Sequence, residues 1–183
     1  MNGYDTFDKI NSEIRNCKLC SLSNTRKNAV PGEGHFLKKL MIIGEAPGYH
    51  EDQSGRPFVG TAGKILRNAL EKNKISIEDV FITNIVKCRP PNNRPPRIVE
   101  KRTCLPYLDR QIVLLQPKII CLLGNVAASY ILNLNSITNE RGKIINKNGL
   151  KFLVTYHPAA LIYNRNLLNT FESDIKKLAE YLY

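Results

Sequence analysis

Residues 40–70 read LMIIGEAPGYHEDQSGRPFVGTAGKILRNAL, and this stretch predicts a strand, a long loop and a helix in succession. Residues 40–43 are an unbroken apolar run, which is typical of a strand buried on both faces. A polar loop begins at Gly44, and Thr61 stands where a side chain caps the following helix. Ligands bind at the carboxyl ends of parallel strands, so a loop this long in this place indicates a functional site.

The rest of the chain continues the alternation of strands and helices. Apolar runs predict three more strands, and apolar residues at helical spacing predict the helices between them. The strands are expected at 80–83, 118–123 and 152–154, and the helices at 1–16, 105–115 (with Pro106 as a kink or late start), 124–132 and 168–182. This alternation predicts an α/β fold with a parallel sheet between helical layers.

Length and composition predict one folded domain over residues 1–183, in which residues 1–39 precede the first strand as an appendage. The chain has 183 residues, of which 43% are hydrophobic, enough for a single well-formed core. The N-terminus has no signal-peptide pattern, and the apolar run 119–123 is far too short to cross a bilayer. We therefore expect a soluble cytoplasmic protein with no membrane partner.

The formal net charge of +11 favours a polyanionic partner. Nucleic acid is the first candidate. An anionic membrane surface is the second, because no strongly basic amphipathic helix stands out. The alternative is that the positive charge reflects a host whose proteins are generally rich in lysine, in which case it indicates no polyanionic partner.

Five cysteines in an intracellular chain argue against a disulfide framework. Cys17 and Cys20 form a CxxC pair, while Cys88 and Cys104 stand singly. Four thiolates suit either zinc or an iron–sulfur cluster, and the spacing selects neither, although the unpaired cysteines lean toward a cluster. Unrelated free thiols are the alternative. Cys121, within an apolar run, is predicted to be a small buried hydrophobe.

Polar residues follow three of the four predicted strands: Glu45, Asn84 and His157. The carboxyl ends of parallel strands meet at one edge of a sheet, so we expect these side chains to line one crevice. A carboxamide can pair with a base edge, an imidazole can stabilise an oxyanion, and a carboxylate can hold water. Taken singly, each of these residues is explained equally well by a structural role in a turn or as a cap.

Two further segments carry candidate contacts to nucleic acid. Phe58, in a glycine-flanked loop, either stacks on a flat ligand or anchors its loop in the core. Four prolines keep residues 88–97 extended, so Arg89, Arg94 and Arg97 are expected to face solvent. This segment is either a basic arm for a phosphate backbone or a connector that brings Cys88 toward Cys104.

These motifs together resemble the uracil-DNA glycosylase superfamily, most closely its family 4, the iron–sulfur branch. The resemblance covers nearly the whole chain. It rests on the four cysteines in matching order and on GEAPG (44–48), GRPFVG (55–60), TNIVKCRP (83–90) and HPAAL (157–161).

The resemblance implies a three-layer α/β/α sandwich with a central four-stranded parallel sheet. It implies a [4Fe–4S] cluster held by Cys17, Cys20, Cys88 and Cys104. It also implies that Phe58 stacks on a flipped uracil, that Asn84 reads the uracil edge, and that His157 contacts O2 and stabilises the uracil anion.

The implied reaction is hydrolysis of the N-glycosidic bond of uracil in DNA, with free uracil and an abasic site as products. Water would be positioned by Glu45 and by backbone N–H groups of the loop that holds Gly44, Ala46 and Gly48. In the best-known branch an aspartate polarises this water; here Glu45, one methylene longer, follows the first motif glycine. Glu51 and Asp52 are nearby alternatives.

The expected partner is uracil-containing DNA, single- or double-stranded. Arg165, just beyond the histidine motif, would fill the space left by the flipped base or hold a phosphate. The chain is expected to act as a monomer, and a sliding clamp is a further candidate partner.

Three other functions fit the sequence less well. A non-catalytic nucleic-acid-binding module would bind DNA in a salt-dependent manner, without regard to uracil. A nucleotide-binding enzyme is disfavoured because the chain has no GxGxxG or GxxxxGK[ST] motif. A deaminase is disfavoured because HxE paired with PCxxC is missing.

Overall fold

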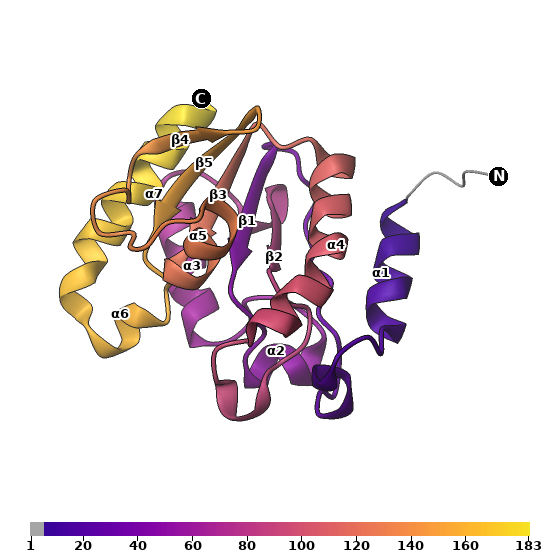
Figure 1. The fold of residues 1–183 in the computed structure, drawn as a ribbon. Coiled ribbons are helices and arrows are strands. Elements are labelled where there is room, and N and C mark those ends of the chain that lie inside the picture. Colours follow the sequence, from indigo (N-terminus) through magenta and orange to yellow (C-terminus); the bar gives the residue numbers. More distant parts are fainter. Residues whose placement is uncertain (1–5) are drawn as a thin grey trace.

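The computed structural model describes residues 6–183 and is built around a five-stranded sheet with the order β2-β1-β3-β5-β4 (Figure 1). The strands are β1 (Leu40–Gly44), β2 (Phe81–Asn84), β3 (Ile119–Leu123), β4 (Ile144–Lys147) and β5 (Leu150–Thr155). Strands β1, β2, β3 and β5 run parallel, as predicted. The carboxyl ends of these four strands therefore lie at one edge.

The predicted number of strands was wrong, because β4 pairs antiparallel with β5 at the sheet edge. Residues 144–147 are at most partly buried and do not form a continuous apolar run. Because the strands were predicted from such runs, this strand was not predicted. Asn148 and Gly149, at φ +50° and +78°, form the turn of this hairpin. An Asn-Gly pair between two short strand-forming segments is the local sequence signature of such a turn.

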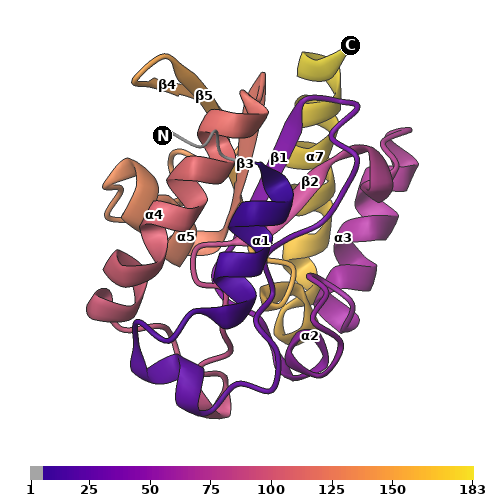
Figure 2. The same cartoon turned by 90° about the vertical axis from the view of Figure 1, so that its right-hand side faces the viewer.

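The helices form a layer on each face of the sheet. Figure 2 shows α4 and α5 on one side and α3 and α7 on the other. The helices are α1 (Phe7–Asn16), α2 (Tyr49–Ser54), α3 (Thr61–Lys72), α4 (Ile98–Leu115), α5 (Gly124–Leu132), α6 (Ala160–Tyr163) and α7 (Leu168–Leu182). This arrangement is the predicted α/β/α sandwich.

Each strand supplies both halves of the core, because successive side chains point to opposite faces. On β1, Met41 and Ile43 pack under α1, α4 and α5, while Leu40 and Ile42 pack under α3 and α7. All five residues of β1 are buried. Burial on both faces is the reason that the strand reads as a continuous apolar run.

The N-terminal helix packs on α4 and belongs to the same core. Thr6 caps α1 by accepting a hydrogen bond from Lys9 N–H at 3.2 Å, and Ile10 and Ile14 are buried. An ion pair between Glu13 and Arg110 joins the two helices. The part of the predicted helix at residues 1–5 lies outside the described residues.

Two helix starts differ from the prediction. Thr61 is the first residue of α3 rather than its cap; the cap is Gly60, whose N–H donates to Glu51 Oε1 at 2.9 Å. Helix α4 begins at Ile98 and contains Pro106, so it starts earlier than the apolar stripe suggested. Cys104 consequently lies on α4.

Candidate functional site

Glu45, Asn84 and His157 lie on one cleft of about 340 Å³ at the carboxyl edge of the sheet. Glu45 follows β1, Asn84 ends β2 and His157 follows β5. Gly48 and Phe58 of the long loop line the same cleft. The parallel register therefore brings together residues that are far apart in the sequence, as the strand pattern predicted.

Asn84 presents a buried hydrogen-bond acceptor to the cleft. Its side chain is 1% exposed, and among residues 6–183 its Oδ1 receives no hydrogen bond. A Cβ atom at Gly44 would lie 2.5 Å from this oxygen and 2.7 Å from Phe58 Cζ. The glycine therefore lets the amide and the aromatic ring approach the same point.

Phe58 is both a core residue and a wall of the cleft, so it anchors its loop and faces the space where a ligand would lie. Its ring is 5% exposed and packs in the core layer under α3 and α7. Its backbone has φ +52°, which is uncommon for an aromatic residue. At Gly63, a Cβ would lie 1.7 Å from the Phe58 carbonyl oxygen, so the helix can touch this strained turn only through glycine.

His157 is held neutral, with a defined tautomer. Ala159 N–H donates to His157 Nδ1 at 3.2 Å, so the ring proton is on Nε2. Burial lowers the pKa of His157 to about 4, against the opposing effect of Glu51. The His157 ring centroid is 5.9 Å from that of Phe58.

Gly124, the first residue after β3, makes room for His157. It has φ +86°, and a Cβ atom there would lie 2.9 Å from His157 Cβ. Strand β3 lies between β1 and β5 in the sheet, so a larger residue at its end would push His157 away from Asn84 and Glu45. Sequence reasoning did not single out Gly124, although it follows a predicted strand directly.

Glu45 is a partly buried carboxyl group of the cleft. Burial raises the pKa of Glu45, and the positive charge of Lys101 on α4 opposes this effect. A carboxyl group with a raised pKa is a stronger base at neutral pH than an exposed one.

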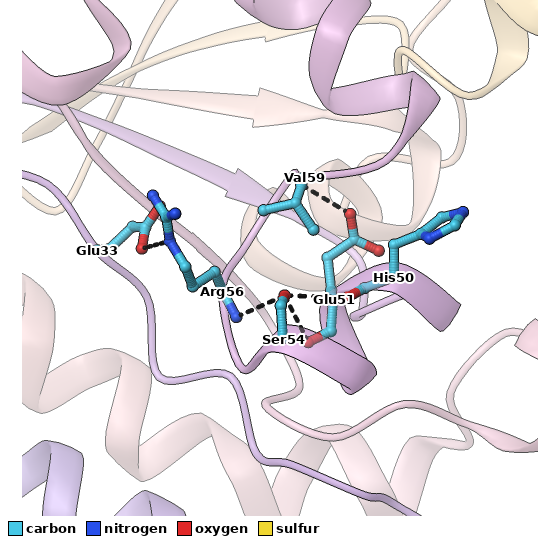
Figure 3. A network of polar contacts seen from close by, with 6 residues as sticks. All are labelled: Glu33, His50, Glu51, Ser54, Arg56 and Val59. Carbon is cyan, nitrogen blue, oxygen red and sulfur yellow. Dashed lines mark hydrogen bonds and ion pairs between the residues drawn. The ribbon is translucent and has the colours of Figure 1, made fainter.

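The two alternative carboxylates both bind backbone N–H groups, and Glu51 also lines the cleft. Glu51 Oε1 accepts from Val59 N–H and Gly60 N–H, both at 2.9 Å, and its Oε2 accepts from Gly48 N–H at 3.1 Å. Figure 3 shows the Glu51 side chain reaching from α2 to Val59. Asp52 Oδ1 accepts from Lys27 N–H at 2.8 Å and Asn28 N–H at 3.2 Å. Both residues thus bind backbone groups and fix the loop.

The same loop is fixed at its far end by Ser54 and Arg56. Ser54 Oγ donates to the His50 carbonyl at 3.0 Å and accepts from Arg56 N–H at 3.3 Å. The Arg56 side chain pairs with Glu33 at 2.9 Å, as Figure 3 shows. Phe58 consequently sits on a loop with few free backbone groups.

The four candidate arginines have different surroundings. Arg97 and Arg165 are exposed. Arg89 Nε donates to Asn93 Oδ1 at 2.7 Å, and its guanidinium lies 5.2 Å from the Tyr49 ring centroid.

Arg94 was expected to face solvent, and its side chain is partly exposed, at 29%. It lines the cleft and pairs through both nitrogens with the buried Glu100, at 2.9 and 2.6 Å. The pairing holds the proline-rich segment against the start of α4.

The cleft has further walls that sequence reasoning missed. They are Pro47, Ala62, Pro90, Asn93, Ala159 and Tyr163. Of these, Tyr163 ends α6 and is 90% exposed. A large aromatic side chain in water, six residues after His157, is the local feature that could have drawn attention to it.

Cys17, Cys20, Cys88 and Cys104 line a second cavity, together with Arg26. Arg26 Nη1 donates to Cys88 Sγ at 2.8 Å, and Lys87 N–H donates to Cys104 Sγ at 3.3 Å. Over residues 6–183, no group of three or more His, Cys, Asp and Glu side chains is arranged to hold a metal ion. Cys121 is fully buried on β3, which confirms the prediction for this residue.

None of the helices within the described chain is long and apolar enough to span a bilayer.

Comparison with known proteins connects this geometry to a family. The model of the uracil DNA glycosylase superfamily matches residues 31–182. The chain is 49% identical to the type-4 uracil-DNA glycosylase of Sulfurisphaera tokodaii, over 96% of this chain and 84% of that protein. It is 42% identical to the type-4 enzyme of Archaeoglobus fulgidus, over 96% and 93%. A type-5 enzyme of Pyrobaculum aerophilum is 29% identical, over 84% and 73%.

Proposed function

The chain belongs to the uracil DNA glycosylase superfamily, and we propose that its cleft holds a uracil flipped out of DNA during hydrolysis of the N-glycosidic bond. It is a DNA-repair glycosylase, which releases uracil and leaves an abasic site. The observation that carries the site assignment is the buried Asn84 Oδ1, which has no partner among residues 6–183 and lies beside Phe58. A buried acceptor without a partner is costly unless a ligand pairs with it.

Asn84 selects uracil through its amide. Uracil offers an N3–H donor beside the O4 acceptor, so Asn84 Oδ1 accepts from N3–H while the amide nitrogen donates to O4. Cytosine presents the opposite pattern at this edge and would leave the buried amide unpaired. Phe58 stacks on the ring, because every base has an apolar face that fits an aromatic side chain.

His157 stabilises the negative charge that develops on uracil as the bond to the sugar breaks. The Nε2–H of the neutral ring donates toward O2, because Nδ1 is occupied by Ala159 N–H. A donor already aligned before the bond breaks requires no reorganisation during the reaction. Glu45 and the N–H groups of Gly44, Ala46 and Gly48 position the attacking water.

The low pKa of His157 predicts the pH dependence of the reaction. With a pKa of about 4, the imidazole stays neutral above roughly pH 5 and is protonated only as pH falls through about 4. We expect single-turnover uracil release to show no change at pH 6.5, the ordinary histidine value. A pH–rate profile from 4 to 8 checks this; an inflection near 6.5 that is lost in His157→Gln would contradict it.

We propose that Cys17, Cys20, Cys88 and Cys104 hold a [4Fe–4S] cluster. In support, all four thiols line one cavity, and thiolates are the usual cluster ligands. When bound, the cluster supplies a covalent link between the N-terminal segment, the residues after β2, and α4.

Replacing Cys88 by serine is expected to remove most of the iron and to lower the unfolding temperature. Metal-binding free energy is also folding free energy when the site joins separate segments. Iron and sulfide content and thermal unfolding measure the effect. Cys121→Ala, a buried cysteine of β3, is the matched control and should keep its iron. Full iron content in Cys88→Ser would remove this residue from the ligand set.

DNA is expected to approach across the carboxyl edge of the sheet. Arg89, Arg97 and Arg165 lie on segments that follow β2 and β5, and we assign them to phosphate contacts. Arg94 is assigned to holding the cleft wall, because its charge is paired with Glu100. The net charge of +11 adds a sequence-independent attraction that weakens with salt.

The direct test is incubation with a uracil-containing oligonucleotide, followed by alkali to cut abasic sites, with a matched thymine oligonucleotide. Cleavage at uracil alone, lost on changes at Asn84 and His157, supports the proposed site. Binding without cleavage by a cluster-loaded preparation would leave only a DNA-binding role for the cleft.

A further inference from the structure

Lys87 is a fully buried lysine three residues past the end of β2, and it lines the cysteine cavity. It is 1% exposed and has the largest of the fully buried side chains among the described residues. Its Nζ donates to Thr83 Oγ1 at 2.6 Å, to the Asn84 carbonyl at 2.9 Å and to Gln111 Oε1 at 2.8 Å. The three donor hydrogens of the ammonium group are therefore all used.

The two side chains that accept from Lys87 both donate to one further group. Thr83 Oγ1 donates to the Pro31 carbonyl at 2.8 Å, and Gln111 Nε2 donates to the same carbonyl at 2.9 Å. The network thus joins β2 to α4 and to the segment before β1. Every hydrogen bond in it is buried.

Stability alone does not explain a lysine in this place. Burying an ammonium group is costly, and all three Nζ acceptors are neutral, so none of its hydrogen bonds is an ion pair. A methionine would fill a similar volume without a charge. What the lysine adds is a fixed position for the Asn84 backbone.

The Asn84 side chain needs such support because its own oxygen has no protein partner among residues 6–183. Contacts with the Gly44 backbone and the Phe58 ring limit its space but do not orient its amide through hydrogen bonds to Oδ1. The position of the amide therefore depends on the backbone from which it extends. Lys87 holds that backbone at the Asn84 carbonyl.

We propose that Lys87 is a positioning residue that aligns the Asn84 amide with the uracil edge. This inference rests on the proposed function, since Asn84 must read uracil for its alignment to matter. A displacement of about 1 Å at a reacting site lowers the rate by about 100-fold. Lys87 thus acts on selectivity and rate without touching the base.

The test is a double-mutant cycle on kcat/KM for uracil release. Lys87→Met is expected to lower kcat/KM by about 100-fold. In an Asn84→Ala background, the same change should have almost no further effect, because the group that Lys87 aligns is gone. Iron content must equal that of the wild type, since Lys87 precedes Cys88.

Thr155→Val is the matched control, because Thr155 Oγ1 makes a buried hydrogen bond to Asp174 at 2.9 Å, at the end of a different strand. It should lower kcat/KM by the same factor in both backgrounds. If Lys87→Met also lowers kcat/KM by the same factor in the wild-type and Asn84→Ala backgrounds, the proposal is overturned and Lys87 only supports the fold. If Lys87→Met does not fold, Lys87→Gln, which keeps an N–H₂ donor, goes through the same cycle.

The two proposals fail in distinguishable ways. If the wild type does not release uracil, the proposed function fails before any variant is compared. If the wild type releases uracil and Asn84→Ala is impaired, but Lys87→Met is as active as the wild type, only the role of Lys87 is excluded. Equilibrium binding of free uracil gives a second readout and should weaken in Lys87→Met.

Discussion

Replacing His157 by alanine is expected to lower the rate of uracil release by about 10²–10³-fold, the effect of losing one aligned donor to a developing oxyanion. This corresponds to about 2.7–4 kcal/mol of activation free energy. The loss should appear in kcat rather than KM, because the negative charge on O2 develops only as the glycosidic bond breaks. Single-turnover kinetics on a uracil-containing oligonucleotide measure it directly.

His50→Ala is the control for this experiment. His50 is an exposed histidine on α2, close to Tyr49, and its loss should leave the rate near that of the wild type. The thermal unfolding of both variants shows whether the fold is intact. A folded His157→Ala variant with near-wild-type turnover would exclude His157 from stabilising the uracil anion.

Replacing Asn84 by aspartate is expected to lower kcat/KM for uracil by about 10³-fold. The carboxylate keeps an acceptor for N3–H but loses the donor to O4, and it places a charge against that oxygen. Losing a buried pairing costs about 1–3 kcal/mol, and repulsion between two acceptors adds to it. Kinetics with uracil and cytosine oligonucleotides, together with free-uracil inhibition, measure rate and selectivity.

Asn68→Asp, on the exposed face of α3, adds the same charge away from the cleft. It separates the effect on uracil from the general weakening of DNA binding by a negative charge. If both variants lose activity equally, repulsion of DNA explains the result and Asn84 does not read the base. If only Asn84→Asp is impaired, the cleft assignment stands.

Much of the fold could be predicted because its causes are local. Residues 40–43 and 119–123 are apolar throughout, since strands at the centre of a parallel sheet are covered on both faces. Strand β4 was missed because its residues are only partly buried, so its sequence lacks that pattern. The Asn148-Gly149 pair was the only local sequence feature that pointed to the hairpin of β4 and β5.

The candidate site was predictable to the extent that topology determines it. Glu45, Asn84 and His157 each follow a strand, and parallel strands deliver their ends to one edge. The surroundings of these residues were not predictable in the same way. Nothing in the order of residues indicates that Arg94 pairs with Glu100, or that Glu51 binds the backbone at Gly48, Val59 and Gly60.

The amino-acid sequence was enough to place polar residues after three of the parallel strands, to single out four of the five cysteines as candidate ligands, and to show the motifs shared with the family. These follow from the spacing of residue types along the chain. Three features became visible only in the folded chain: the pairing of Arg94 with Glu100, the tautomer of His157, and the burial of Lys87 behind Asn84. The physical reason is that burial and hydrogen bonding depend on neighbours brought together by folding, such as Pro31 and Gln111, which the sequence separates widely.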